Sequence, residues 1–262
     1  MNLCAAARLR INLATLCILH PFKNELSRYM SVSSYQVQQT KFQLEHRSGV
    51  FAPSAHGRFY AEHIAISATD SVIDIGCGSG ILSVYAALQG AQVVATDISA
   101  EAVALTQHNG GLNNVAIEGR VGGFFGDYQQ QFDVILANLP QEIVPSAHAL
   151  ELGAGAAEID GGQRGNDLLV ELLQLAPQYM HSNSRLILPL HTLSDYQHSL
   201  KVAMQIFDVR LIAIGDLAAK DFVKQHLDFY LSFARQGTIR LFEQDENWFT
   251  NVYVIELRRK SG

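Results

Sequence analysis

The strongest constraint on the fold is a glycine-rich turn that joins a short apolar run to a helical pattern. The run Val72–Ile75 leads into the sequence Gly76-Cys77-Gly78-Ser79-Gly80, and apolar residues at helical spacing follow from Ile81. Glycine allows the backbone to take positive φ and allows a ligand to approach the main chain closely. The order strand, glycine turn, helix therefore predicts a ligand-binding turn at the end of a buried strand.

Short apolar runs and longer amphipathic stretches alternate over the next hundred or so residues. Strands that are apolar throughout, such as Asp133–Ala137, indicate a sheet buried on both sides. Strand and helix in alternation are typical of a parallel sheet with helices on both faces. We predict an α/β fold, Rossmann-like and doubly wound, with a mostly parallel sheet of seven strands. The predicted strands are Val72–Ile75, Gln92–Thr96, Asn114–Glu118, Phe132–Ala137 and Arg185–Pro189, and the predicted helices are Ser79–Gln89, Ala100–Asn109 and Asn166–Met180.

The two ends of the chain depart from this alternation. Before the glycine turn, alternating residues from Tyr35 to Leu44 predict a polar-faced strand or hairpin arm. After the parallel region, the patterns predict strands at Val209–Ile214, Thr238–Phe242 and Asn251–Leu257 and a helix at Asp221–Ala234. Strand-rich endings of this kind usually add antiparallel strands to a parallel sheet. We therefore predict an antiparallel C-terminal edge.

An acidic residue lies at the end of each of the first two predicted strands. Asp74 comes shortly before the first glycine, and Asp97 follows Val93–Thr96. A carboxylate at the tip of the second strand is placed to bind a ribose diol. The turn reads GxGxG, whereas dinucleotide sites favour GxGxxG, and two carboxylates would repel a pyrophosphate. A ligand with a cationic amino-acid end near Asp74 and a ribose near Asp97 fits better; the alternative is a purely structural turn.

Residues 72–97 resemble the first two motifs of class I S-adenosylmethionine-dependent methyltransferases. The resemblance implies that S-adenosyl-L-methionine is the cofactor and that the glycine loop holds its methionine part. The loop residues concerned are Asp74, Gly76, Cys77, Gly78 and Gly80. The resemblance also implies that Asp97 binds the ribose hydroxyls and that Ile98 packs on the adenine ring, unless Ile98 is a core residue. Phe124 and Phe125 are further candidates for the adenine contact.

The fourth predicted strand ends in Asn138-Leu139-Pro140-Gln141, where open α/β sheets bind ligands. The Asn138 side-chain carbonyl can accept an N–H from an incoming amine or amide and so orient its lone pair. The stretch resembles a variant of the Asn-Pro-Pro-Tyr motif of the HemK-type, amino-methylating branch. This implies catalytic roles for Asn138, Leu139 and Pro140 and a cofactor contact for Asn138. Leu139 replaces a proline and Gln141 replaces an aromatic ring, so a stacking surface is missing; a plain strand-ending turn is the alternative.

Two further segments resemble the same branch. Residues 49–54 look like its cofactor-covering loop, and residues 160–165 look like its Asp-Gly-Gly segment, either a mobile lid or a turn before a helix. The residues before Val50 are too few for the N-terminal helical bundle of HemK-type enzymes. We expect the insertion at about 217–249 to shape the acceptor site instead, through Trp248, Phe249 and His226; the alternative is a structural edge or a dimer surface.

We predict an N-terminal extension, residues 1–30, followed by a methyltransferase domain, residues 31–262. Residues 1–24 contain no acidic side chain, which fits a transit-like segment, a start assigned too early or a packed helix. No apolar run reaches the length of a membrane-spanning helix, so no membrane partner is expected. The three cysteines form neither a disulfide framework nor a zinc spacing. We expect a cytoplasmic protein without metal, or import into an organelle if residues 1–30 are a transit peptide.

These observations favour methyl transfer to a nitrogen, amide or amine, of a protein, peptide or small molecule. Nineteen Lys and Arg against 25 Asp and Glu, a formal charge of −6, disfavour a nucleic-acid partner, because such proteins usually carry a basic excess. No spacing pairs His148, His181, His191 or His198 with a carboxylate, so each can be a surface or core histidine; His191 is the best-placed candidate base because it follows the fifth strand. The alternatives are a small-molecule O-methyltransferase and a non-catalytic methyltransferase-like partner subunit.

Overall fold

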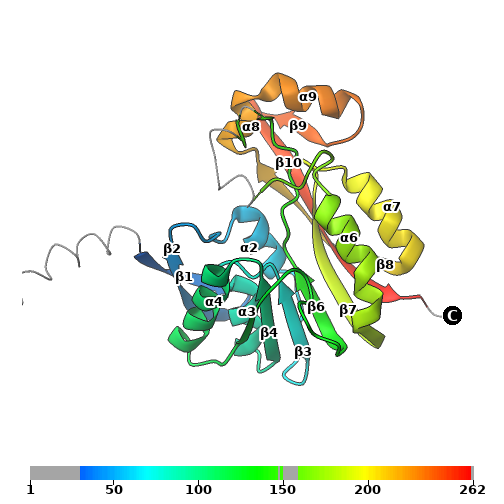
Figure 1. The fold of residues 1–262 in the computed structure, drawn as a ribbon. Coiled ribbons are helices and arrows are strands. Elements are labelled where there is room, and N and C mark those ends of the chain that lie inside the picture. The colour runs from blue at the N-terminus through cyan, green and yellow to red at the C-terminus, as the bar shows by residue number, and fades with distance from the viewer. Residues whose placement is uncertain (1–29, 147, 150–158, 261–262) are drawn as a thin grey trace, which may run out of the picture.

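A twisted, mostly parallel sheet alternating with helices forms the centre of the molecule, which confirms the predicted α/β class (Figure 1). The structure is a computed structural model that describes residues 30–146, 148–149 and 159–260, so the predictions for residues 1–29 lie outside it. The strand order is β5-β4-β3-β6-β7-β10-β8, and β9 pairs with β10. The strands are β3 (Ser71–Ile75), β4 (Gln92–Asp97), β5 (Glu118–Val121), β6 (Phe132–Ala137), β7 (Met180–His191), β8 (Phe207–Ala218), β9 (Leu241–Gln244) and β10 (Asn247–Arg259).

The predicted antiparallel C-terminal edge is confirmed; β10 and β8 form it, and β8 is the outermost strand. The last strand, β10, lies inside β8 and pairs antiparallel with both β7 and β8. Val252, Val254 and Leu257 of β10 are fully buried. Much of β8 remains exposed, and Leu211 and Ile214 keep more than half of their surface accessible.

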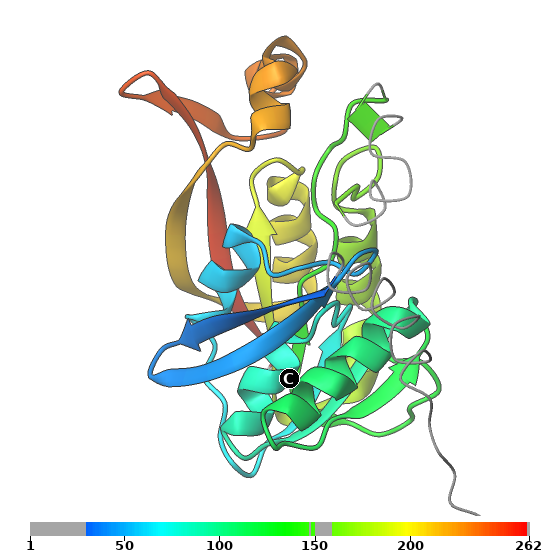
Figure 2. The same cartoon turned by 90° about the vertical axis from the view of Figure 1, so that its left-hand side faces the viewer.

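Helices cover both faces of the sheet (Figures 1 and 2). On one face lie α2 (Ala55–Ala61), α3 (Ile81–Leu88) and α4 (Ala100–Leu112), and on the other lie α6 (Asp167–Leu175) and α7 (Tyr196–Ile206). The alternate side chains of the central strands enter two separate cores, as Ile73 and Ile135 do on the α6 side and Val72 and Val134 on the α3 side. This is the three-layer arrangement of a doubly wound fold.

An N-terminal hairpin packs against the first helical layer. It consists of β1 (Met30–Val37) and β2 (Thr40–Arg47), which pair antiparallel, as the alternating pattern predicted. Phe42 and Leu44 are buried in the α3-side core. The Asn109 side chain in α4 fixes the register, because its Oδ1 accepts from the Glu45 N–H at 2.8 Å and its Nδ2 donates to the Glu45 carbonyl at 3.0 Å.

The segment between β8 and β10 builds a small separate core at one end of the sheet (Figure 1). It contains α8 (Asp221–Gln225), α9 (Leu227–Arg235) and β9, so the predicted helix 221–234 is interrupted at His226. Tyr230 in α9 is fully buried and its hydroxyl donates to the Ile143 carbonyl at 2.8 Å. This bond ties the segment to the chain that follows β6.

Several predicted boundaries are shifted, and β7, β8 and β10 are longer than predicted. The third strand lies at Glu118–Val121, not at 114–118, and β9 lies at Leu241–Gln244, not at 238–242. The predicted helix 166–180 ends at Leu175 and continues as a 3-10 turn over Ala176–Tyr179. The cause of the last difference is Pro177, which has no N–H for the helical hydrogen-bond ladder. Among the described residues, no helix is long and apolar enough to cross a membrane.

We expect Leu172→Ala to lower the free energy of unfolding by about 2–5 kcal/mol. Leu172 lies on the buried face of α6, and truncating its side chain leaves a cavity. Leu168→Ala on the same helix is the matched control, since 37% of Leu168 is exposed and the change should cost under about 1 kcal/mol. Urea unfolding of the two variants measures the difference. Equal losses would contradict the assignment of the α6 core.

Candidate functional site

A cavity of about 360 Å³ lies at the carboxyl ends of the parallel strands. The residues that line it follow β3, β4, β5 and β6 in turn, and Gly49–Phe51 and Leu168 complete the wall. The chain runs outward from β3 to β5 and then returns to β6 on the other side of β3. This reversal is the topological switch point at which open α/β sheets bind ligands, and the volume is within the range of small-molecule sites, about 300–1,000 Å³.

The glycine turn forms one wall of this cavity. Gly76 and Gly78 line it with φ of +72° and +53°, a backbone conformation that L side chains rarely adopt. A Cβ added at Gly78 would lie 3.1 Å from the Phe51 carbonyl oxygen, which also accepts a hydrogen bond from the Ser79 N–H. The loop at residues 49–54 therefore lies directly on the glycine turn.

Three other predicted loop residues lie behind the cavity wall. Gly80 caps α3 with φ of +87°, and a Cβ there would lie 2.9 Å from the Thr106 side chain, so this glycine allows α3 and α4 to pack closely. The Cys77 thiol is buried, and burial raises its pKa, so it stays protonated at neutral pH. Asp74 is 1% exposed and does not line the cavity. Its Oδ2 accepts from the Ser83 hydroxyl at 2.5 Å, and its Oδ1 has no hydrogen-bond partner.

Asp97 stands at the tip of β4 and lines the cavity. Its Oδ2 accepts from the Gly78 N–H at 3.0 Å, and its Oδ1 accepts from the Ser99 N–H at 2.9 Å. These bonds fix the carboxylate beside the glycine turn and leave further lone pairs for a ligand, since each carboxylate oxygen can accept more than one bond. The next residue, Ile98, is 80% exposed at the cavity although it is strongly apolar.

The phenylalanine pair after β5 is divided between the cavity and the core. Phe124 lines the cavity with φ of +42°, and its carbonyl accepts from the Thr96 hydroxyl at 2.5 Å. Phe125 is buried and stacks on Tyr179 with ring centroids 3.7 Å apart. Only Phe124 of the two is therefore placed to contact a ligand.

The lining residues fit a nucleoside with a cationic end and do not fit a pyrophosphate. No Lys, Arg or His is among the described residues that line the cavity, while Asp97 supplies a carboxylate for hydroxyl groups. The exposed Ile98 and the half-buried Phe124 offer apolar contact for a planar ring, whose binding would remove the Ile98 side chain from water. S-adenosylmethionine has these three parts, a base, a ribose and a cationic sulfonium amino acid.

At the end of β6, Asn138, Leu139 and Pro140 form a wall between this cavity and a second, smaller one. The Asn138 amide has no hydrogen-bond partner among the residues that the structure describes. A Cβ at Gly57 in α2 would lie 3.0 Å from Asn138 Nδ2, so α2 approaches Asn138 this closely because residue 57 has no side chain. Asn138 is thus held in place sterically with its polar atoms free.

The second cavity has a volume of about 30 Å³ and a polar lining. His56 from α2, Gln141 and Glu142 after β6, His191 at the end of β7 and Lys220 after β8 all contribute side chains to it. Lys220 Nζ donates to Glu142 Oε1, and His191 Nδ1 lies 3.7 Å from the same oxygen. The Gln141 Oε1 accepts from the His191 N–H at 3.3 Å.

Burial controls the charges in this polar cavity. It lowers the pKa of His191 to about 3, with Lys220 as the second cause, and it holds the pKa of His56 well below the ordinary value of 6.5. Burial also raises the pKa of Glu142, although the Lys220 ammonium opposes this shift. Both imidazoles are therefore neutral at neutral pH, and Glu142 and Lys220 form the only ion pair among the residues lining this cavity.

The sequence indicated only part of this second cavity. His191 was the histidine singled out, but His56, Glu142 and Lys220 were missed, because they are far apart in the chain and belong to no motif. Of the insertion at 217–249, Lys220 reaches the cavity, whereas Trp248, Phe249 and His226 line neither cavity. Trp248 packs instead in the small core around α9, and Phe249 stacks on Phe242. The expectation that these three residues shape the acceptor site is therefore not supported.

The segment at residues 160–165 forms a turn before α6 that is anchored on both sides. The Gly161 N–H donates to the Glu142 carbonyl at 2.9 Å, and the Gly161 carbonyl accepts from the Asp167 N–H at 2.9 Å. Arg164 pairs with Asp195, whose backbone N–H donates to the Arg164 carbonyl at 2.8 Å. These bonds describe a fixed turn, which is one of the two predicted alternatives.

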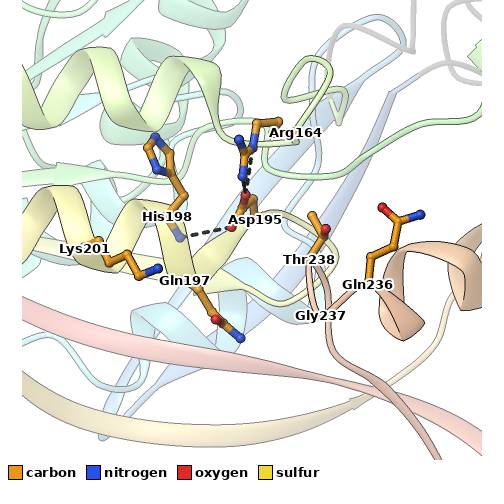
Figure 3. A pocket seen from close by; sticks show the side chains of 8 residues that line it. All are labelled: Arg164, Asp195, Gln197, His198, Lys201, Gln236, Gly237 and Thr238. Atoms are coloured by element: carbon orange, nitrogen blue, oxygen red, sulfur yellow. Dashed lines mark hydrogen bonds and ion pairs between the residues drawn. The ribbon is translucent and has the colours of Figure 1, made fainter.

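A further polar hollow of about 210 Å³ lies between the start of α7 and the loop after α9 (Figure 3). Arg164 and Asp195 face each other there, and His198, Lys201 and the residues Gln236–Thr238 complete the lining. It shares no lining residue with the two cavities described above. The hollow is therefore separate from the predicted cofactor and acceptor residues. In the described part of the chain, no three His, Cys, Asp or Glu side chains are arranged to hold a metal ion.

Comparisons with known proteins find similarity to methyltransferases. Residues 60–149 match the family model of ribosomal protein L11 methyltransferase (PrmA). The chain is 44% identical over 69 residues to ribosomal RNA small subunit methyltransferase C of Chromohalobacter salexigens, a match covering 26% of this chain and 21% of that protein. It is 30% identical over 132 residues to a Methanocaldococcus jannaschii protein provisionally named a protein N5-glutamine methyltransferase, covering 50% of this chain and 66% of that one.

A solved structure with a similar fold is the Thermus thermophilus 16S rRNA N2 G1207 methyltransferase in complex with AdoMet and guanosine. The TM-score is 0.58 with 14% identity over 88% of this chain and 51% of that chain, so the likeness concerns the fold alone. The chain spans between about a fifth and two thirds of the length of the curated relatives named here. Because one of them is named for ribosomal RNA, the prediction that disfavoured a nucleic-acid partner is not supported.

We expect Asp74→Asn to raise the free energy of unfolding at pH 8 and to change it little near pH 4. Burial raises the pKa of Asp74 from 3.8 to about 7, with Asp97 as a further cause, and the Ser83 hydrogen bond opposes the shift. The folded wild type therefore binds a proton that the unfolded chain releases, and stability is lost as the pH rises from about 4 to 7. Asparagine carries no charge and keeps an oxygen for Ser83, so the gain at pH 8 should be about 2–4 kcal/mol.

Urea unfolding of the cofactor-free protein at pH 4, 6 and 8 measures this difference. An identical pH dependence in the two proteins would show that the Asp74 carboxylate is not destabilised by its surroundings.

Proposed function

The chain belongs to the class I S-adenosylmethionine-dependent methyltransferases, and on this premise we propose that it transfers a methyl group to a nitrogen of a protein, peptide or small molecule. In this proposal residues 31–262 form the methyltransferase domain, with residues 217–249 as an insertion. The catalytic residues are Asn138, Leu139 and Pro140.

One observation carries the proposal. The wall formed by Asn138, Leu139 and Pro140 faces the cofactor cavity on one side and a buried polar cavity on the other. The methyl donor in the first cavity and the methyl acceptor in the second would meet at this wall. Methyl transfer requires little beyond such positioning. A subunit that only lends a surface has no need of a second, polar cavity at this place.

The residues of the first cavity have distinct binding roles in this proposal. The glycine turn with Gly76, Gly78 and the backbone of Cys77 holds the methionine part of S-adenosylmethionine, Asp97 binds the ribose hydroxyls, and Ile98 and Phe124 contact the adenine. Asp74 and Gly80 act from behind the wall, the first beneath the turn and the second by letting α3 pack on α4. When bound, the cofactor supplies an electrophilic methyl group.

Asn138 orients the acceptor. Its side-chain oxygen accepts an N–H hydrogen of the incoming group, which turns the nitrogen lone pair toward the cofactor cavity. Gly57 leaves room for this side chain at the start of α2.

A nitrogen of RNA is the second candidate acceptor. It is favoured by the relative that is named as a ribosomal RNA methyltransferase. An oxygen acceptor finds less support, because a hydroxyl substrate needs a general base. Burial keeps the pKa of His56 and His191 low, so each is a weak base.

Incubation with methyl-labelled S-adenosylmethionine and a bacterial extract, fractionated into protein, RNA and small molecules, tests the function. Label on a nitrogen of protein, peptide or small molecule supports the proposal, and label on an oxygen contradicts it. Label confined to RNA establishes the second candidate.

We expect Asp97→Ala to weaken binding of S-adenosylhomocysteine by about 1–3 kcal/mol, because hydrogen bonds from hydroxyl groups to the carboxylate are lost. Isothermal titration calorimetry measures the change. Asp208→Ala, at an exposed position of β8, is the matched control and should bind as the wild type does. Unchanged binding in Asp97→Ala would remove the ribose-binding role.

We expect Asn138→Ala to lower label transfer roughly 10- to 100-fold through loss of positioning, with affinity for S-adenosylhomocysteine near that of the wild type. Transfer into the extract fraction that the wild type labels is the measurement, with calorimetry in parallel. A variant that loses cofactor binding but retains transfer at saturating cofactor would show that Asn138 belongs to the cofactor site alone.

A further inference from the structure

We propose that the cavity lined by His56, Gln141, Glu142, His191 and Lys220, the polar pocket, binds the acceptor's nitrogen group and selects an –NH₂ group at the end of an unbranched chain over one attached to an aromatic ring. The inference rests on the proposed function and assigns the substrate group that this site takes. Four arguments carry it: the burial of the pocket, its free polar atoms, its size and its position.

The pocket holds buried polar atoms with no hydrogen-bond partner. Gln141, Glu142 and His191 are 3%, 6% and 3% exposed, yet Gln141 Nε2, Glu142 Oε2 and His191 Nδ1 lack partners, as does the buried Nε2 atom of the half-buried His56. An unpaired buried polar group costs about 1–3 kcal/mol, and native proteins contain few of them. Four in one small space indicate a site that a polar ligand completes.

The free atoms match a group with N–H hydrogens. Glu142 Oε2 is an acceptor, because its partner oxygen already receives the Lys220 ammonium. His191 Nδ1 is also available as an acceptor when Nε2 carries the hydrogen toward Thr250 Oγ1, 3.2 Å away. A neutral primary nitrogen group has two hydrogens; with one given to the Asn138 side-chain oxygen, the other can go to Glu142 Oε2 or His191 Nδ1, and the group so loses its freedom to rotate. Lys220 neutralises Glu142, so a neutral carboxamide enters at low electrostatic cost, whereas an amine, which is a cation at neutral pH, enters as a neutral group only after losing a proton.

Gln141 provides a hydrogen bond that distinguishes a carboxamide from an amine. Its Oε1 is occupied by the His191 N–H, and its Nε2 is a free donor. A carboxamide has a carbonyl oxygen that can accept from this donor, and an amine does not. The residue stands where the resembled motif has an aromatic ring, so hydrogen bonding replaces stacking at this position.

Size and position exclude ring systems. A cavity of about 30 Å³ holds roughly one or two water-sized groups, which is too little for a nucleobase. The same cavity shares Asn138, Leu139 and Pro140 with the cofactor cavity. A terminal nitrogen that enters it therefore comes to the wall across which methyl transfer is proposed, while a ring would stop outside.

The test uses the full chain saturated with S-adenosylhomocysteine and three probes: propionamide, propylamine and guanosine. Binding is followed by the ¹⁵N signals of the histidine rings, with the signals of the two pocket histidines assigned from the His56→Asn and His191→Asn variants. We expect propionamide or propylamine to shift the signals of His56 and His191 in a saturable way and guanosine to leave them unchanged.

Two variants separate the roles of the pocket residues. Glu142→Gln should weaken binding of both chain-borne probes about tenfold or more, because a charged acceptor is lost. Gln141→Leu should weaken binding of propionamide and leave propylamine binding unchanged. His198→Asn, at the separate polar hollow, is the matched control for surface histidines and should bind all probes as the wild type does. Thermal unfolding confirms that each variant is folded.

The outcomes distinguish this inference from the function on which it rests. Failure of the wild type to bind S-adenosylhomocysteine would overturn the proposed function itself. If S-adenosylhomocysteine binds normally, three results would overturn the proposal for the polar pocket and leave the proposed function standing. These are no shift of the two histidine signals by either chain-borne probe, an equal shift by guanosine, and wild-type probe binding in Glu142→Gln.

Discussion

The burial of β3, β4 and β6 on both faces of the sheet is the constraint on which the rest of the structure depends. A strand with apolar cores on both sides presents few polar side chains along its length, so chemistry is confined to the residues that follow each strand. Because the strands are parallel, these ends meet at one edge of the sheet. Gly76, Asp97, Phe124 and Asn138 are brought together for this reason, although up to 62 residues separate them in the chain.

The same constraint produces two cavities with one common wall. The first is lined by backbone and apolar groups with a single carboxylate, which suits a nucleoside, and the second is lined by buried polar side chains. Asn138, Leu139 and Pro140 separate them at the end of β6. The antiparallel β10 contributes indirectly, because its residues Thr250 and Asn251 pair with the end of β7 and hold His191 and Thr192 in position. The C-terminal part of the chain therefore contributes to the second cavity in two ways: β10 holds the end of β7 in position, and Lys220 lines the cavity directly.

The sequence predicted local features well where one segment carries the whole signal. The glycine turn, the two acids and the end of β6 are each contained in a few consecutive residues, and glycine spacing and apolar runs report on them directly. Boundaries were less accurate where the local signal is weak: β5 is short and largely exposed, and Pro177 converts the end of a helical pattern into a 3-10 turn. The position of β10 depends on competition between two strands for the interior, which no local pattern contains.

The sequence by itself therefore determined the α/β class, the strand–turn–helix unit and the type of ligand that the first cavity accommodates, because each follows from residues adjacent in the chain. Only the tertiary structure decided that Asp74 lies beneath the turn and that Trp248 and Phe249 are remote. It also decided that His56, Glu142, His191 and Lys220 enclose one polar space. Such a cluster forms by the packing of α2, β7 and the segments after β6 and β8. Its members share no spacing, so their meeting is a property of the fold and cannot be read from periodicity.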